Sequence, residues 1–212
     1  MKRTSELDGI EFDVEEVVAR SGYIDEYIFL QDLKERKLFL NTEISQDTVY
    51  GIVRNIMQYN AEDKGIPVEE RKPITLYVVT NGGEVDAGFE LIDAIRSSKT
   101  PVRTVNLGYC YSMGFLIFLA GHKRYAQKNA KFLHHDGMSV IMNSGTKVKD
   151  QMEFQDKVED RVKHFVLERT NIDEKEYRKR VRTEWYMFSD EAKQYGVTDY
   201  IIGDDCDIDE VI

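Results

Sequence analysis

The chain has 212 residues, 42% of them hydrophobic, a length and composition that suit one globular domain with a full core. Its formal net charge is −10, with acidic residues concentrated near both ends, which argues against binding to nucleic acid backbones or to anionic membrane surfaces. Two cysteines are too few for a disulfide framework and are compatible with a reducing compartment, so we expect a cytoplasmic protein.

The two ends of the chain differ from its middle. Residues 1–28 form an N-terminal segment whose sequence favours neither helix nor strand clearly, so both an ordered and a mobile segment remain open. Residues 203–212 form an acidic tail. The first residues lack the apolar core of a signal peptide, and the longest apolar run, residues 113–120, is too short to cross a bilayer. No Ser- and Gly-rich linker divides the rest, which predicts one compact domain without a membrane anchor.

The first half of the chain alternates between strand and helix patterns. Residues 38–40 predict a short buried strand, and the following polar segment, residues 41–48, opens a helix. The apolar positions of this helix recur at three- and four-residue steps, namely at Val49, Ile52, Val53, Ile56 and Met57. Residues 74–80 are apolar and β-branched, which predicts a strand that is buried on both faces.

The second half continues the alternation. After a helix that begins beyond Glu84, the patterns predict strands at 102–108, 123–126 and 131–135 and helices at 111–120, 146–169 and 189–195. The helix at 146–169 is long and highly charged. Strands that alternate with helices predict right-handed β-α-β units, so we expect an α/β fold with a mainly parallel sheet.

Asn81, Gly82 and Gly83 follow the predicted strand 74–80 and precede a helix. Glycines there allow positive φ and close backbone approach, and amides at a helix start point at developing negative charge. A Gly-Gly turn alone also has a purely structural interpretation.

Ser112 lies where strand 102–108 gives way to an apolar helix. A serine in that turn is exposed at the carboxyl edge of the sheet, where the sites of α/β proteins usually form. On this segment alone, Ser112 is either a nucleophile or the N-cap of the helix.

His134 and His135 are adjacent on a predicted strand. Side chains alternate along a strand, so only one of the two imidazoles can face the site. A histidine can remove a serine proton near neutral pH, although a single histidine is more often a surface or packed residue.

These segments, taken together, resemble the proteolytic subunit of the Clp protease. The matching motifs are the strand and Gly-Gly turn at 76–85, Tyr-Ser-Met-Gly at 111–114, the histidine strand at 129–135 and the closing signature at 187–199. The resemblance covers about residues 30–202. It implies a ClpP/crotonase-type spiral of β-α-β units with a protruding handle helix at about 146–169.

The resemblance also implies roles for individual residues. Ser112 would attack the peptide carbonyl, His135 would act as general base, and the amides of Gly83 and Met113 would form the oxyanion hole. No cofactor and no metal ion are implied.

The same resemblance implies a domain organisation and partners. Residues 29–202 would form the peptidase domain, between the N-terminal segment and the acidic tail. Subunits would associate into two stacked seven-membered rings, which receive unfolded polypeptides from an AAA+ unfoldase. The segment 136–146 departs from the family's Pro- and Gly-rich substrate channel, so the cleavage preference stays open.

The acid of the family's catalytic triad has no evident counterpart. Counting back from Ser189 places Val181 or Arg180 at the family's Asp position, and neither side chain can accept the histidine N–H. Asp136 is adjacent to His135 but is expected on the opposite face. Glu184 is the nearest acid and a candidate, with a backbone carbonyl or a water as the alternatives.

Three functions therefore remain open. The first is a serine endopeptidase whose activity is reduced or regulated because the triad acid is not evident. The second is a catalytically weak or inactive ring subunit of the same family. The third is a crotonase-type acyl-CoA enzyme, which would leave Ser112 and His135 without a purpose.

Overall fold

The structure is a computed structural model, and it describes residues 4–7, 10–13, 24–137, 142 and 144–212. The expectations for the N-terminal segment and for the substrate-channel segment fall in part outside the described residues, at 1–3, 8–9, 14–23, 138–141 and 143.

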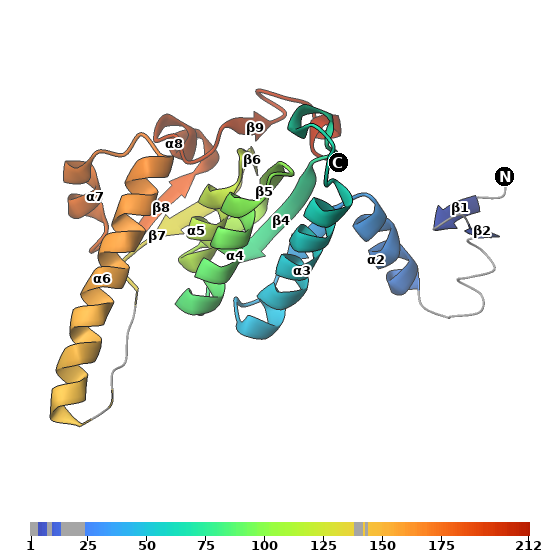
Figure 1. The fold of residues 1–212 in the computed structure, drawn as a ribbon. Coiled ribbons are helices and arrows are strands. Elements are labelled where there is room, and N and C mark those ends of the chain that lie inside the picture. Colours follow the sequence, from blue (N-terminus) through green and yellow to red (C-terminus); the bar gives the residue numbers. More distant parts are fainter. Residues whose placement is uncertain (1–3, 8–9, 14–23, 138–141, 143) are drawn as a thin grey trace.

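A seven-stranded sheet organises the chain (Figure 1). Its strands are β3 (Lys37–Leu40), β4 (Ile74–Thr80), β5 (Val102–Tyr111), β6 (Lys123–Gln127), β7 (Lys131–His134), β8 (Trp185–Phe188) and β9 (Tyr200–Ile202). The main path runs β3-β4-β5-β6-β9, and β7 pairs with β5 and with β8. All pairs in this sheet are parallel except β7–β8. The α/β fold with a mainly parallel sheet is therefore confirmed.

Helices cover one face of this sheet, where α3, α4 and α5 lie side by side (Figure 1). The helices are α2 (Ile24–Lys34), α3 (Gln46–Glu62), α4 (Val85–Ser97), α5 (Met113–Ala120), α6 (Gly145–Arg169), α7 (Glu174–Arg180) and α8 (Ser189–Gln194), with short 3₁₀ turns at Val68–Glu70 and Ile208–Glu210. A separate antiparallel pair, β1 (Thr4–Leu7) with β2 (Ile10–Asp13), lies at the N-terminus.

The sequence patterns located the face of α3 that packs on the core. Four of the five predicted positions are buried, namely Val49, Ile52, Val53 and Ile56. The prediction for Met57 is wrong, because 66% of the surface of this residue is exposed. Tyr59 takes the remaining core position instead, and its hydroxyl donates to the carbonyl oxygen of Leu33. The 3.6-residue period therefore predicted the buried face of α3 correctly, except for one residue at the edge of that face.

Strand β5 is longer than the sequence suggested, because it continues past Gly108 to Tyr111. Its first part, residues 103–106, pairs with β6, and its last part, residues 109–111, pairs with β7. Gly108 lies between these two pairings, so the glycine marks a change of partner and does not end the strand. This extension brings the strand to the residue immediately before Ser112.

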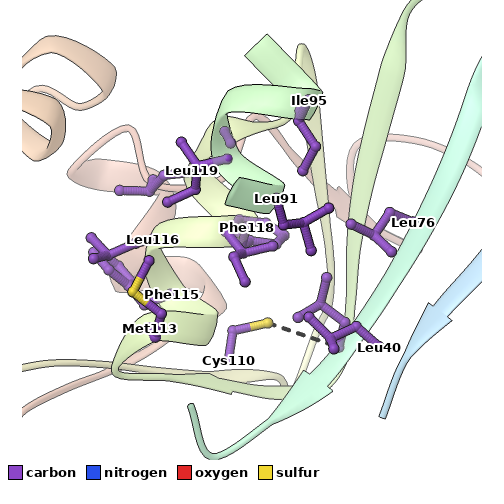
Figure 2. Packing of buried hydrophobic residues seen from close by; sticks show 14 of the residues in the cluster. Leu40, Leu76, Leu91, Ile95, Cys110, Met113, Phe115, Leu116, Phe118 and Leu119 are labelled. Atoms are coloured by element: carbon purple, nitrogen blue, oxygen red, sulfur yellow. Dashed lines mark hydrogen bonds between the residues drawn. The ribbon is translucent and has the colours of Figure 1, made fainter. Parts of the chain in front are cut away.

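The core behind Ser112 is formed by α5, all of whose residues are buried. Figure 2 shows Met113, Phe115, Leu116 and Phe118 packed with residues of the neighbouring helix and strands. Phe118 also contacts the ring of Phe132 on β7, with 4.9 Å between the ring centroids. Helix α5 is therefore fixed to the strand that leads to the two histidines.

Cys110 belongs to the same core and is completely buried. Its thiol donates to the carbonyl oxygen of Val78 at 3.5 Å, as the dashed line in Figure 2 marks. Burial raises the pKa of the Cys110 thiol well above its usual value, which keeps the sulfur protonated. Cys110 is thus a packing residue.

Helix α6 extends away from the body of the domain (Figure 1). Its buried residues, Phe165 and Val166, both lie near its C-terminal end. Met152 and Phe154, in its first half, are 57% and 64% exposed. The long charged helix predicted at 146–169 is confirmed as a protruding element.

Sequence patterns missed α2, α7 and β8. Helix α2 has no buried residue, and α7 buries only Tyr177, so neither shows a clear apolar stripe. Strand β8 has four residues, in which buried Trp185 and Met187 alternate with exposed Tyr186 and Phe188. Four alternating residues are too few to separate from a loop by pattern alone.

Replacement of Phe118 by alanine is expected to lower the free energy of unfolding by about 3–5 kcal/mol, because the cavity left under α5 cannot close fully. Met57→Ala, on the exposed side of α3, is the matched control and should change stability by less than about 1 kcal/mol. Urea denaturation followed by tryptophan fluorescence measures both. Equal effects of the two substitutions would contradict this account of the core.

Candidate active site

The turn after β4 depends on two glycines at positive φ. Gly82 has φ of 105° and Gly83 has φ of 149°. A Cβ at Gly83 would lie 2.2 Å from the carbonyl oxygen of Ile44, and a Cβ at Gly82 would lie 2.8 Å from the Cβ of Ser112. Any side chain at these positions would therefore displace the backbone, and the two turns of the site meet at Gly82.

Ser112 occupies an unusual backbone conformation, with φ of 53° and ψ of −120°. Non-glycine residues with positive φ cost about 1–3 kcal/mol and persist where their surroundings hold them. Here the amide of Ser112 donates to the carbonyl oxygen of Leu133 at 2.9 Å. Ser112 is the N-cap residue of α5 by position, as one of the two interpretations predicted, but its side chain makes no capping hydrogen bond to the helix.

Two backbone amides converge on this turn. Among the residues that the structure describes, neither the N–H of Gly83 nor the N–H of Met113 donates to a protein acceptor. The Met113 nitrogen would lie only 3.2 Å from a Cβ built on Gly82, the neighbour of Gly83. Two such donors at the start of a buried helix can stabilise a negatively charged oxygen.

An open cavity of about 620 Å³ adjoins these amides. Gly83, Ser112, Met113 and His135 all line it, so the four residues predicted for the site surround one space. Its further lining comes from α5, α6, α7 and the segments that follow β7 and α7, and it includes Leu116, Val158, Val162, Tyr177 and Val181. The cavity therefore offers an apolar wall beside the serine.

The two histidines diverge as the strand alternation predicted. His134 is 2% exposed and stacks on Phe115, with 5.1 Å between the ring centroids. Burial lowers the pKa of His134 to about 4, and the neighbouring His135 adds to this effect. His134 is therefore a neutral core residue near neutral pH, whereas His135 is partly exposed.

The imidazole of His135 contacts an acid. Its Nδ1 lies 3.1 Å from Oε1 of Glu184, and because a carboxylate can only accept, Nδ1–H is the donor. The candidate acid from the sequence thus lies within hydrogen-bond distance of the ring. Nε2 of His135 is buried and has no partner among the described residues, so Ser112 and His135 are not hydrogen-bonded in this structure.

The positions that sequence counting gave for the triad acid are occupied differently. The carbonyl oxygen of Val181 accepts the amide of Asp136 at 2.7 Å. Arg180 pairs with Glu176 at 2.8 Å and lies over the ring of Trp185. Within the described part of the chain, neither residue makes a hydrogen bond or an ion pair with the imidazole of His135.

The described residues lack two features that mark other classes of protein. Within this part of the chain, no group of three or more His, Cys, Asp or Glu side chains is arranged to hold a metal ion. None of the described helices combines the length and the apolar character that spanning a membrane requires.

Comparison with known proteins identifies the family of this chain. Residues 22–205 match the family model described as Clp protease, and the chain therefore belongs to the Clp protease family, a family of peptidases.

Individual relatives agree with this assignment. The chain is 29% identical over 180 residues to the ATP-dependent Clp protease proteolytic subunit 2 of Treponema pallidum. The aligned region covers 84% of this chain and 87% of the relative. The chain is 27% identical over 198 residues to the protein of the same name from Bacillus licheniformis, with 92% and 100% covered. The Treponema denticola protein of that name is 28% identical over 188 residues, with 88% and 91% covered.

The buried His134 predicts a loss of stability in mild acid. Its pKa is near 6.5 in the unfolded chain and about 4 in the fold, so the unfolded state binds more protons between these values. Stability therefore falls as the pH drops from about 6.5 to 4, by about 3 kcal/mol from this group. Urea denaturation at several pH values measures it.

His134→Leu is expected to remove that part of the pH dependence, whereas His164→Gln, at an exposed position on α6, should keep it. The comparison of the two variants cancels the titration of the carboxylates, which both share. A wild-type slope in His134→Leu would show that His134 is not held neutral by burial.

Proposed function

We propose that the protein is a serine-type endopeptidase that cleaves unfolded polypeptides, with Ser112 as nucleophile and His135 as general base. The observation that carries this proposal is the backbone of Ser112. Its positive φ places the residue at a sharp turn between strand and buried helix, beside two amides that have no acceptor among the described residues. Nucleophilic serines of hydrolases occupy strained turns of this kind.

The proposed chemistry begins when Ser112 Oγ attacks the peptide carbonyl and its proton passes to Nε2 of His135. The oxygen of the tetrahedral intermediate would accept the N–H groups of Gly83 and Met113, and loss of one such donor typically costs about a hundredfold or more in rate. His135 then protonates the leaving amine, and water releases the acyl group by the same steps.

One observation favours the second candidate, a weak or inactive subunit. Ser112 and His135 share no hydrogen bond in the structure, and the rest of the proposed machinery needs that contact. Catalytic hydrogen bonds are often long in unliganded enzymes and tighten when substrate binds, so we rank the active peptidase first. Membership in the Clp protease family leaves the acyl-CoA alternative without a supporting observation.

The partners belong to the proposal as well. The relatives are named proteolytic subunits of an ATP-dependent protease, which supports an ATP-driven unfoldase as the partner. The proposed location is the cytoplasm, for which the two unpaired cysteines are the supporting observation. The protruding α6, with exposed apolar Met152 and Phe154, supports its use as a handle between two stacked seven-membered rings. The peptidase domain would be residues 29–202.

A fluorophosphonate probe is expected to label the wild-type protein at Ser112 and to leave Ser112→Ala unlabelled, because the probe reacts only with activated serines. Mass spectrometry of the labelled peptide identifies the residue. His135→Ala should slow labelling by about a hundredfold or more, since the general base is lost.

Turnover of an unstructured peptide by the purified chain, abolished in Ser112→Ala, would exclude the inactive-subunit candidate. Absence of both labelling and turnover in assembled protein, at any pH between about 6 and 9, would instead refute the peptidase proposal.

Light scattering coupled to size-exclusion chromatography is expected to give the mass of two stacked rings for the wild type. Phe154→Glu should reduce this mass, because a charge would replace an apolar contact of the handle, whereas Phe154→Leu should preserve it. A monomeric wild type would contradict the proposed chamber.

A further inference from the structure

We propose that Glu184 is the positioning acid of this site, which orients His135 and balances its charge in the place that the family gives to an aspartate. This inference rests on the proposed peptidase function and deepens it. Its basis is the hydrogen bond from Nδ1–H of His135 to Oε1 of Glu184 at 3.1 Å. Glu184 acts through His135 and has no contact with the reacting atoms in this account.

The pairing of β7 with β8 explains why these two residues meet. The antiparallel register places Leu133 opposite Tyr186 and His134 opposite Trp185. One step further, beyond the last ladder pair, the same register places His135 opposite Glu184. Directly opposed residues of an antiparallel pair point to the same face, so the imidazole and the carboxylate share one side of the sheet.

The ends of this pair are anchored by buried residues. Trp185 is 2% exposed and meets the ring of Tyr195 edge-on, with 5.0 Å between the centroids. On the other face, Tyr186 meets the ring of Tyr111, the residue before Ser112, with 5.8 Å between the centroids. Glu184 is therefore the neighbour of an anchored tryptophan, and the strand that presents it is tied to the serine turn.

Other groups near the ring do not offer the same contact. The carboxylate of Asp136 makes no hydrogen bond to His135 in the described part of the chain, and its own amide is committed to the carbonyl oxygen of Val181. Within the same part of the chain, Glu184 alone accepts a hydrogen bond from the imidazole of His135.

The contact fixes the proton of the neutral imidazole on Nδ1, which leaves the lone pair of Nε2 free to accept the serine proton. When Nε2 receives the proton from Ser112 Oγ, the ring becomes positively charged and the carboxylate of Glu184 stabilises it. The proton then moves to the leaving amine and the ring returns to neutrality. The carboxylate of Glu184 does not take up this proton at any step.

The carboxylate of Glu184 is more open to water than its partner. Its side chain is 57% exposed, whereas that of His135 is 24% exposed. Water screens the charge of an exposed carboxylate and can replace part of its hydrogen bond. We therefore expect a smaller loss on its removal than the roughly ten thousandfold known for buried triad acids.

Glu184→Ala is expected to lower kcat for an unstructured peptide by about a hundredfold, with KM within about threefold of wild type. Glu184→Gln should lose a similar factor, because it lacks the charge, and Glu184→Asp should restore part of the rate. Glu69→Ala, an exposed glutamate outside the cavity, is the matched control and should leave kcat unchanged. A kcat for Glu184→Ala within threefold of wild type would overturn the inference.

The tautomer of His135 is a readout that a merely structural role would not move. The chain has four histidines, so selective labelling of histidine with ¹⁵N gives few ring signals, and His135→Gln assigns the one of interest. At a pH where the ring is neutral, the wild type is expected to carry its proton on Nδ1, and Glu184→Ala to lose this preference. An unchanged tautomer in Glu184→Ala would contradict the proposal.

The two proposals fail separately. If Ser112→Ala abolishes turnover while Glu184→Ala does not reduce it, the peptidase function stands and the role of Glu184 is refuted. If the wild type shows no turnover or labelling, the peptidase function fails, and the tautomer measurement alone decides whether Glu184 orients His135.

Discussion

The backbone at Ser112 is the constraint on which the site depends. A positive φ at a serine is unfavourable on its own, and two contacts hold it in place. The preceding strand is paired with β7, whose Leu133 accepts the amide of Ser112, and the following helix is entirely buried. Because both flanks are fixed, the turn cannot relax. It therefore holds the amide of Met113 beside the turn of Gly82 and Gly83, where two donors face one cavity.

Strand β7 connects every part of this arrangement. Its backbone supports Ser112, one of its faces sends His134 into the core against Phe115, and the next residue presents His135 to the cavity. Its other edge pairs with β8, which brings Glu184 to the imidazole. A change in the register of β7 by one residue would exchange the environments of the two histidines, because alternate residues face opposite sides. The core packing of Phe132 and His134 thus leaves the imidazole of His135 on the opposite face of the strand.

Sequence patterns predicted most of the fold, because long apolar or periodic segments such as β4 and α3 carry their own signal. The full set of site residues came from the family resemblance, and its four members line one cavity. The patterns did not predict that β5 runs beyond Gly108, since a glycine between two pairing partners has the same pattern as a strand end. Glu184 was named only as the nearest acid. Its position depends on the antiparallel pairing of β8, a strand of four residues whose pattern is too short to recognise, so counting along the chain led to Val181 and Arg180 instead.

The proposed role of Glu184 would move the acid to another place in the sequence while the chemistry that it serves is kept. What the imidazole requires is an acceptor at Nδ1 in the plane of the ring, and any strand that runs beside β7 on the correct face can supply it. Glu184 directly precedes β8, and its carboxylate is more exposed to water than the imidazole of His135. The strength of this hydrogen bond then depends on what surrounds Glu184, because a lower local dielectric strengthens the attraction between carboxylate and imidazolium. A surface that excludes water from the start of β8 would therefore strengthen the orientation of His135 without touching the serine.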